Sequence, residues 1–552
     1  MRFFAMSLLT LLFISAAACG ETGLRPHTDD TDDGPDTDTG PTITSMPGWE
    51  LAWAVHAGGN ENTEEGGEMA REVGTAIAPL SGGDVYVAGW AAGAVFGTGE
   101  PNETAFPEDE IGWSDAFLAR YEADGSLGWV RRIGGADKGT GDYAFDVAAL
   151  ADGSAAVVGR FDAPEIVLGE GEPNETVLAS GGEWFDVNAF VARYFADGGL
   201  DWAIKIPMIE DSYVYGFSVD ELADGQLLVG GTFEGTLWPG TGFEISSMPP
   251  ESGSSFDGYL AWFEANGSVA RAVRTGNGNQ LWCHAIAVVD DGSAIVAALY
   301  RDGEVFGAGE ENETTPGCDG SEPFSCTSLA RYGPDGMLEW VRDLRINCIG
   351  WGNVSIAPLD SGEIGLIARF GCPSDPDGDG DFYELAAEEP GWESWGVVVA
   401  EYRAEDGELL WARMGQNKGH HSYGKARAVV PMPGGGMIAA FAFNETLEFE
   451  GDDEGQRPLT SAGDQDIALV SFSSTGEIRW MHRMGGPEWD FPTFGAQLDG
   501  TSLWLTGAYR SDPFVPTDGH GNEVALPLTE SIWDETTDIY LLRFDATGPA
   551  AE

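Results

Sequence analysis

Short alternations of apolar and polar residues, separated by glycine-containing turns, fill the chain from about residue 49 onward. In "FLARYEADGSLGWVRRI", which starts at Phe117, two alternating segments flank the turn signal "ADGS", and this pattern predicts a β-hairpin. The hairpin recurs as "FVARYFADGGLDWAIKI" from Phe190, "LARYGPDGMLEWVRDL" from Leu329 and "VAEYRAEDGELLWARM" from Val399. No long stretch of helical periodicity follows the N-terminal leader, so the sequence predicts an all-β protein.

The second strand of this hairpin occurs seven times, at intervals of about 70 residues. Its marker is Trp53, Trp129, Trp202, Trp340, Trp411 or Trp480, and Arg271 stands at the remaining position. Each unit holds a second hairpin as well, such as "VGTAIAPLSGGDVYVAGW" from Val73. A four-stranded antiparallel unit that cannot bury its own faces and is repeated in tandem indicates a β-propeller blade. The tryptophans are then structural residues that fill the space between blades.

The two ends of the chain predict how the ring closes. A lone strand around "LAWAV" at Leu51 precedes the first complete unit, and the chain closes on three strands that end with "YLLRF" at Tyr540. The N-terminal strand therefore supplies the outer strand of the last blade, which removes an open seam. We predict a seven-bladed β-propeller of four-stranded antiparallel blades over residues 47–552.

These motifs resemble a known repeat family. The pattern D-x-F-x-A-R-Y, D-G-x-L-x-W, G-G and G-x-V-Y-V-A-G is similar to the bacterial seven-bladed β-propeller repeat over residues 49–548. The "DG-x-L-x-W" element also resembles the tryptophan-docking repeats of quinone-dependent dehydrogenase propellers, although no residues match a quinone site. The resemblance implies a fold that is common in secreted and lipid-anchored proteins, and it implies little chemistry.

The N-terminus is typical of an export signal. Arg2 and the apolar run "FFAMSLLTLLFIS" precede "AAAC", which resembles a lipobox with Cys19 as the lipidated residue. An ordinary secretory leader cut near Ala18 is the alternative. Residues 1–18 are thus the predicted signal peptide, and residues 19–46, rich in Asp and Thr, are a predicted solvated tether. We expect a monomer in the bacterial cell envelope, at the outer membrane or cell surface, that meets the membrane only through its lipid.

Charge and cysteines narrow the partners. The 92 acidic and 27 basic residues give a net charge of −65, which disfavours nucleic acid and attracts cations. The alternative meaning of this charge is solubility, including in a salty medium. The cysteines suit an oxidising compartment. We expect disulfides between Cys318 and Cys326 and between Cys348 and Cys372, with Cys283 left buried or as a free thiol.

The segment "CPSDPDGDGDFYE" is the sharpest local motif. Asp375, Asp377, Asp379 and Asp381 alternate as in the front of a calcium loop, where alternate oxygens converge on one hard cation. The pattern departs at its end, because the twelfth position is Ala386 rather than Glu, and Glu384 or Glu388 would have to substitute. A solvated acidic loop is the alternative. Calcium is the cofactor that the sequence suggests.

Other candidates lie where the long B-to-C and the D-to-A loops of a propeller meet around the channel mouth. Aromatic residues near the starts of the A strands could grip a sugar or a peptide, or could pack on one another. They are Tyr143, Tyr215, Trp282, Trp351, Tyr423 and Trp489. His420 and His421 belong to the same face but lack zinc spacing. The phrase N-E-T, found in four B-to-C segments, is interpreted as a structural turn leading into a small hairpin.

Three functions fit this sequence. The first is a non-catalytic propeller that binds an envelope protein or a glycan through its loop-rich face. The second is a hydrolase or lyase, such as a carbohydrate-active enzyme, with carboxylates and calcium at the channel mouth. The third is a purely structural envelope protein. No nucleophile–base, P-loop or dinucleotide motif occurs in the body of the chain, so no catalytic residue is assigned and the first function is preferred.

Overall fold

The computed structural model describes residues 46–59, 72–106, 114–135, 141–180, 187–209, 213–247, 256–278, 280–317, 326–346, 354–371, 395–418, 425–449, 458–498, 501–528 and 537–547. The chain divides into two compact units, residues 1–42 and 43–552, and every described residue belongs to the second. The described residues form strands, turns and loops. None of them belongs to a helix that could cross a membrane.

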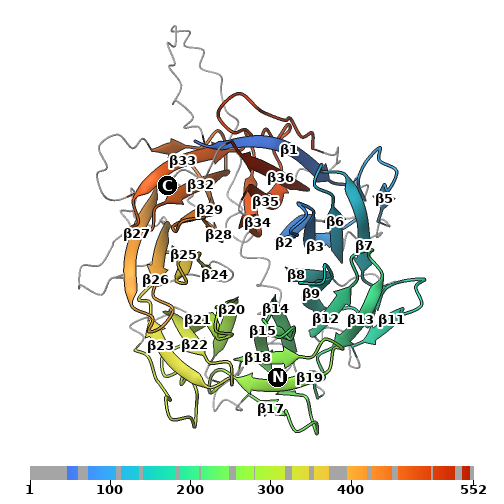
Figure 1. The fold of residues 1–552 in the computed structure, drawn as a ribbon, viewed down its shortest axis with the longest axis vertical. Helices are drawn as coiled ribbons and strands as arrows, with labels where there is room; N and C mark the ends of the chain where they lie inside the picture. The colour runs from blue at the N-terminus through green and yellow to red at the C-terminus, as the bar shows by residue number, and fades with distance from the viewer. Residues whose placement is uncertain are drawn as a thin grey trace, which may run out of the picture. The chain divides into compact units, whose positions relative to one another are not determined.

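Seven antiparallel sheets stand side by side in a ring (Figure 1), which confirms the predicted seven-bladed β-propeller. Each blade has strands A to D from the inside outward. The innermost A strands are β2 (Val73–Pro79), β8 (Asp142–Ala149), β14 (Tyr213–Glu221), β20 (Leu281–Val288), β24 (Val354–Pro358), β28 (Lys425–Pro431) and β34 (Asp490–Leu498). The B strands are β3 (Val85–Ala91), β9 (Ala155–Phe161), β15 (Leu227–Glu234), β21 (Ala294–Tyr300), β25 (Ile364–Phe370), β29 (Met437–Phe443) and β35 (Ser502–Tyr509).

The outer strands carry the motifs that reveal the repeat. The C strands, which contain the "ARY" phrase or its variants, are β6 (Asp115–Tyr121), β12 (Asn188–Tyr194), β18 (Asp257–Phe263), β22 (Cys326–Tyr332), β26 (Gly396–Tyr402), β32 (Asp466–Phe472) and β36 (Asp538–Ala546). The D strands are β7 (Leu127–Ile133), β13 (Leu200–Lys205), β19 (Val269–Arg274), β23 (Leu338–Asp343), β27 (Leu409–Lys418), β33 (Ile478–Met484) and β1 (Trp49–Ala57). We number the blades 1 to 7 from β2 to β34.

The first strand of the chain completes the last blade, as predicted. β1 pairs antiparallel with β36, with Trp53 opposite Arg543 and Ala57 opposite Ile539. Blade 7 therefore has the strand order β1-β36-β35-β34. This pairing satisfies the backbone groups of β36 that would otherwise form an open edge.

The hydrophobic core lies between the blades rather than within any one of them. One cluster joins Ala88 and Leu118 of blade 1 to Val157 and Phe190 of blade 2, and all four side chains are fully buried. Similar clusters join blades 2 and 3, 3 and 4, 5 and 6, 6 and 7, and 7 and 1. Each sheet thus buries its faces only against its neighbours, which is the physical reason for the tandem repeat.

The B-to-C connections gather on one face of the ring, which we call the loop-rich face. They contain small hairpins formed by β4 (Val95–Phe96) with β5 (Thr104–Ala105), β10 (Glu165–Leu168) with β11 (Thr176–Ala179), β16 (Thr236–Leu237) with β17 (Ile245–Ser246), and β30 (Thr446–Phe449) with β31 (Leu459–Thr460). Three of these touch the D strand of the preceding blade by a single bridge, such as Gly134 to Val167. The fourth, β30, pairs with β27 over four residues, so that blade 5 becomes a six-stranded sheet.

Candidate binding face and inner wall

The recurring tryptophan of each D strand docks on the C-to-D turn of the next blade. Trp129 lies against Gly198, where φ is +85° and an added Cβ would sit 2.8 Å from the indole ring. Glycine is therefore needed at this turn for its positive φ and for the close approach of the ring. The same contact joins Trp53 to Gly125, Trp202 to Gly267, Trp340 to Gly407 and Trp411 to Gly476. These tryptophans spend their surface on the joints between blades.

The arginine of the "ARY" phrase reinforces the same joint. Arg120 Nη1 and Trp129 Nε1 both donate to the carbonyl oxygen of Ala196, at 2.7 and 3.0 Å. Arg120 also forms an ion pair with Asp84 in the A-to-B turn of its own blade. Blade 2 repeats this arrangement toward Ala265 with Arg193 and Trp202. The motif that defines the repeat is thus a latch between neighbouring blades.

The N-E-T phrase fixes the hairpins of the loop-rich face. In blade 1, Asn102 Nδ2 donates to the carbonyl oxygens of Leu127 and Gly128 on the D strand, and Glu103 accepts from the Gly99 N–H. Thr104 Oγ1 donates to the Asn102 carbonyl. The corresponding bonds recur at Asn174 and at Asn312. These side chains hold the loops in shape, as the structural interpretation expects.

The predicted aromatic residues of blades 2 to 4 contact one another. The Tyr143 ring lies 5.0 Å from Trp90, and the Tyr215 ring lies 5.8 Å from Trp282. The buried guanidinium of Arg160 lies over both tyrosines, at 4.7 and 5.6 Å from the ring centres. Tyr215 and Trp282 are each only 2 % exposed, so their faces are occupied by neighbouring side chains. The packing alternative raised from the sequence describes these three residues.

A β-bulge in the A strands places a second row of rings beside the first. The pairing register shifts between Ala144 and Asp146, between Gly216 and Ser218 and between Cys283 and Ala285, which leaves one extra residue at each shift. Those residues are Phe145, Phe217 and His284, and their rings lie 5.4 and 5.8 Å apart in that order. Burial lowers the pKa of His284 to about 4, so its imidazole is neutral at neutral pH.

Asp146 follows the first of these bulges and ties two inner strands together. Its carboxylate accepts from the Ser218 hydroxyl at 3.0 Å and from the Val219 N–H at 2.9 Å, both on the next blade. Burial raises the pKa of Asp146 to about 7 and that of Asp220 to about 6. The inner wall therefore holds carboxyl groups that change protonation near neutral pH.

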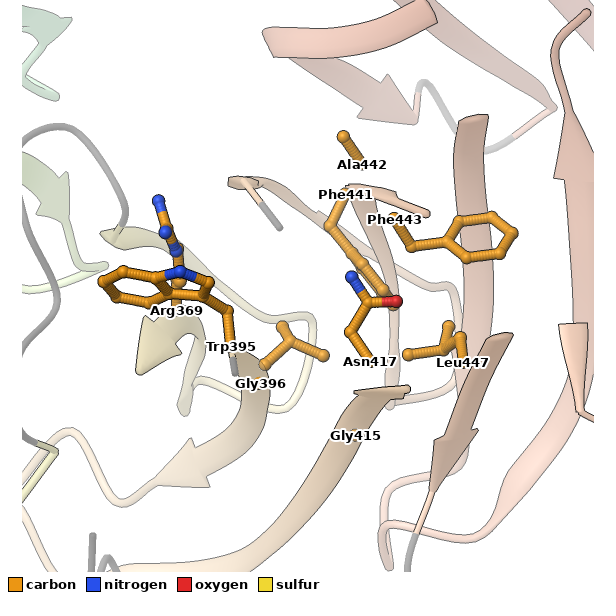
Figure 2. Close-up of a pocket in the computed structure, with 10 residues that line it drawn as sticks. Arg369, Trp395, Gly396, Gly415, Asn417, Phe441, Ala442, Phe443 and Leu447 are labelled. Carbon is orange, nitrogen blue, oxygen red and sulfur yellow. The ribbon is translucent and has the colours of Figure 1, made fainter. Parts of the chain in front are cut away.

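A cavity opens on the loop-rich face between blades 5 and 6. Figure 2 shows Asn417 between two groups of side chains, with Arg369 and Trp395 on one side and Phe441, Phe443 and Leu447 on the other. The Arg369 guanidinium lies 3.3 Å from the centre of the Trp395 ring. The space not occupied by atoms, its mouth included, is about 250 Å³.

Several sequence candidates lie outside the described residues. They are Cys19, Asp375, Asp377, Asp379, Asp381, Trp351, Tyr423, His420, His421, Cys318, Cys348 and Cys372. Cys326, which begins β22, is disulfide-bonded, and the pairing predicted for it stays a prediction. Cys283 is a free and fully buried thiol whose pKa burial raises to about 12. Trp489 is half-buried and precedes β34.

Sequence reasoning missed the residues that line the cavity and the inner wall. Asp146, Asp220 and Asn417 stand in strands whose sequence looks like that of every other blade. A comparison of aligned repeats offers one signal, because Asn417 stands six residues after the marker Trp411, where the first, second and sixth markers are followed by Gly59, Gly135 and Gly486. A departure from the repeat consensus is thus the feature that points to this position.

Comparisons with known proteins give fold-level similarities alone. No known protein family matches the sequence, and no curated protein matches it. A puromycin hydrolase S511A mutant complexed with PGG is 13 % identical over 85 % of this chain, with a TM-score of 0.41. The chain spans 54 % of the length of that structure.

Two further solved structures are similar over most of their length. The H270A virginiamycin B lyase from Staphylococcus aureus is 11 % identical, with a TM-score of 0.36 over 89 % of this chain and 98 % of its own. A polysaccharide lyase of family PL25, an ulvan lyase, is 9 % identical, with a TM-score of 0.37 over 79 % of this chain and 92 % of its own. Similarity at this level carries no information about what this chain binds or catalyses.

Proposed function

We propose that this protein is a non-catalytic binding module of the bacterial cell envelope that holds a protein or a glycan on its loop-rich face. Lipid on Cys19 anchors it, and residues 19–46 act as the tether between the membrane and the propeller. The single observation that carries the binding role is the cavity beside Asn417, which belongs to the loop-rich face and breaks the repeat of the blades. The latch and N-E-T side chains support this view, because their polar groups are already used inside the fold.

The proposal is tested by binding and turnover on the same preparation. The mature protein, purified from its own envelope after cross-linking, should carry a stoichiometric protein partner or should bind a defined glycan on an array. Val177→Glu, on the β11 hairpin, should weaken that binding, whereas Met337→Glu, in a C-to-D turn on the opposite face, should not. Both side chains are exposed, at 51 % and 46 %, so the two variants are matched. Equal loss in both variants, or no ligand at all, would contradict the proposal.

An enzymatic function has one specific observation in its favour. The pKa of Asp146 lies near 7, and a carboxyl group with that pKa suits general acid–base work at neutral pH. Turnover of any substrate in a polysaccharide panel, lost in Asp146→Asn and kept in Asn417→Leu, would favour a hydrolase or lyase acting at the inner wall. Binding without turnover across the panel would favour the binding module.

A further inference from the structure

The cavity beside Asn417 lies where one blade lacks an ion pair that four others share. At this rim an acid that begins the C strand pairs with a base on the D strand, and the distances range from 2.5 to 3.5 Å. The pairs are Asp115 with Arg132, Asp257 with Arg274, Asp466 with Arg483 and Asp538 with His56. In blade 5 the register places Gly396 and Met414 at the same two positions. The charged side chains are absent there, and the space that they would fill is the cavity.

The cavity presents one polar atom that has no partner among the described residues. Asn417 is 7 % exposed, and its Nδ2 donates to Asn444 Oδ1 at 2.6 Å. Its own Oδ1 is buried and accepts no hydrogen bond. A buried acceptor left without a donor costs about 1–3 kcal/mol. A ligand that brings a donor to this atom would recover that cost.

The remaining walls are apolar. Val397, Phe441, Phe443 and Leu447 line the cavity and are each at most 6 % exposed, and Ala442 and the glycines at 396 and 415 complete the lining. A sugar ring carries several hydroxyl groups, and walls with one acceptor would leave most of them unpaired. An anion would meet the Asn417 carbonyl oxygen and the field of a protein with a net charge of −65. The lining therefore suits a compact apolar group with a single donor.

We propose that this cavity receives the hydroxyl-bearing side chain of a protein partner, with tyrosine as its ligand class. This inference rests on the proposed binding function, and it selects protein over glycan. The phenol ring would contact Phe443 and Leu447, and its O–H would donate to Asn417 Oδ1. Tyrosine is among the residues that most often anchor protein interfaces by filling a pocket, because it combines a large rigid ring with one polar end.

The test uses small probes, so it does not depend on a partner. Phenol, toluene and glucose are titrated into the full chain, and the methyl resonances of Leu447 and Val397 are followed by NMR. We expect phenol to shift both resonances and toluene, which lacks the donor, to bind roughly tenfold more weakly. In Asn417→Leu, phenol and toluene should bind equally. If that variant does not fold, the comparison of phenol with toluene on the unmodified chain decides.

The outcomes separate this inference from the proposed function. Equal binding of phenol and toluene to the unmodified chain, preferential binding of glucose, no binding at all, or a crystal soaked in phenol that shows an ordered water only would each overturn the tyrosine site. Donor-selective phenol binding supports it even if no envelope partner is captured. Capture of a partner with no phenol binding would support the binding module and overturn this site.

Discussion

The guanidinium of Arg271 lies 3.8 Å from the centre of the Trp262 ring, and these two residues exchange the roles of the Arg193 and Trp202 pair in the preceding blade. In blade 2 the arginine is on the C strand and the tryptophan is opposite it on the D strand. In blade 3 the tryptophan is on the C strand, and Arg271 on the D strand donates to the Pro334 carbonyl of the next blade. The absence of the marker tryptophan from blade 3 is therefore an exchange across one strand pair.

This exchange predicts a strong coupling between the two positions. Trp262→Arg or Arg271→Trp alone places two like side chains opposite each other, and each should lower the free energy of unfolding. The double variant should recover most of the loss, with a coupling of about 0.5–3 kcal/mol. Urea unfolding of the four proteins measures this coupling, and strictly additive losses would contradict the exchange.

The latch at Trp129 separates packing from hydrogen bonding. Trp129→Ala removes a ring held against Gly198 and should cost about 3–5 kcal/mol. Trp129→Phe keeps most of the ring and loses the bond to the Ala196 carbonyl, so we expect a cost nearer 1 kcal/mol for that bond. Thermal and urea unfolding compare the two variants. Equal losses would mean that the indole N–H, and not the ring, dominates the joint.

Stability should depend on pH through Asp146. Its pKa of about 7 in the folded chain lies above that of an unfolded aspartate, about 4, so the folded state binds more protons between these two values. This contribution to the free energy of unfolding is therefore present below pH 4 and is lost as pH rises through 7. Asp146→Asn should remove that part of the slope.

The measurement is the difference between the urea midpoints of the unmodified chain and Asp146→Asn at several pH values. His284 acts in the opposite direction, because its pKa of about 4 lies below the unfolded value of about 6.5. Its contribution is common to both proteins and cancels in the difference. A difference that does not change between pH 4 and pH 7 would contradict the assignment.

Removal of the closing strand should expose an edge. A chain that starts at residue 58 lacks β1, so the backbone groups of β36 that pair with Trp49 to Ala57 lose their partners. We expect this chain to oligomerise or aggregate, whereas a chain that starts at residue 46 stays monomeric. Light scattering on the two truncated proteins, at matched concentration, makes the comparison. Two equally monodisperse chains would show that the edge is protected by other means.

The acidic loop at 375–381 predicts calcium binding. Calcium should bind with a measurable heat and raise the unfolding temperature, and a chelator should reverse both effects. The paired variant Asp377→Asn and Asp379→Asn should abolish the response. Asp452→Asn with Asp453→Asn, in another acidic segment, serves as the control. The same response in both paired variants would mean that calcium acts through general screening.

The periodicity of the sequence was sufficient for the blades and their closure. The turn signals and the marker tryptophans place the outer hairpins, and the lone strand around Leu51 predicts its pairing with β36, because these features depend on local pattern. The bulges at Phe145, Phe217 and His284 were not predicted. A bulge changes the register by one residue, and the strand sequence on either side stays apolar.

The candidate site was less predictable, because it depends on contacts between blades. Asp146 matters through Ser218 and Val219, which are more than 70 residues away in the chain. Tyr143 and Tyr215 were predicted to lie near each other, but the guanidinium of Arg160 between them was not. Asn417 stands out only when the cavity is seen, since an asparagine at a strand end is otherwise an ordinary surface residue.

The pairing of β30 with β27 has a consequence for how a partner can meet this ring. Seven similar sheets would offer a rotationally repeated rim, on which a partner could settle in several equivalent orientations. Within the described parts of the chain, blade 5 is the sheet that carries two additional strands. A partner that recognises this sector would find one address on the rim, and so would bind with one orientation and a stoichiometry of one.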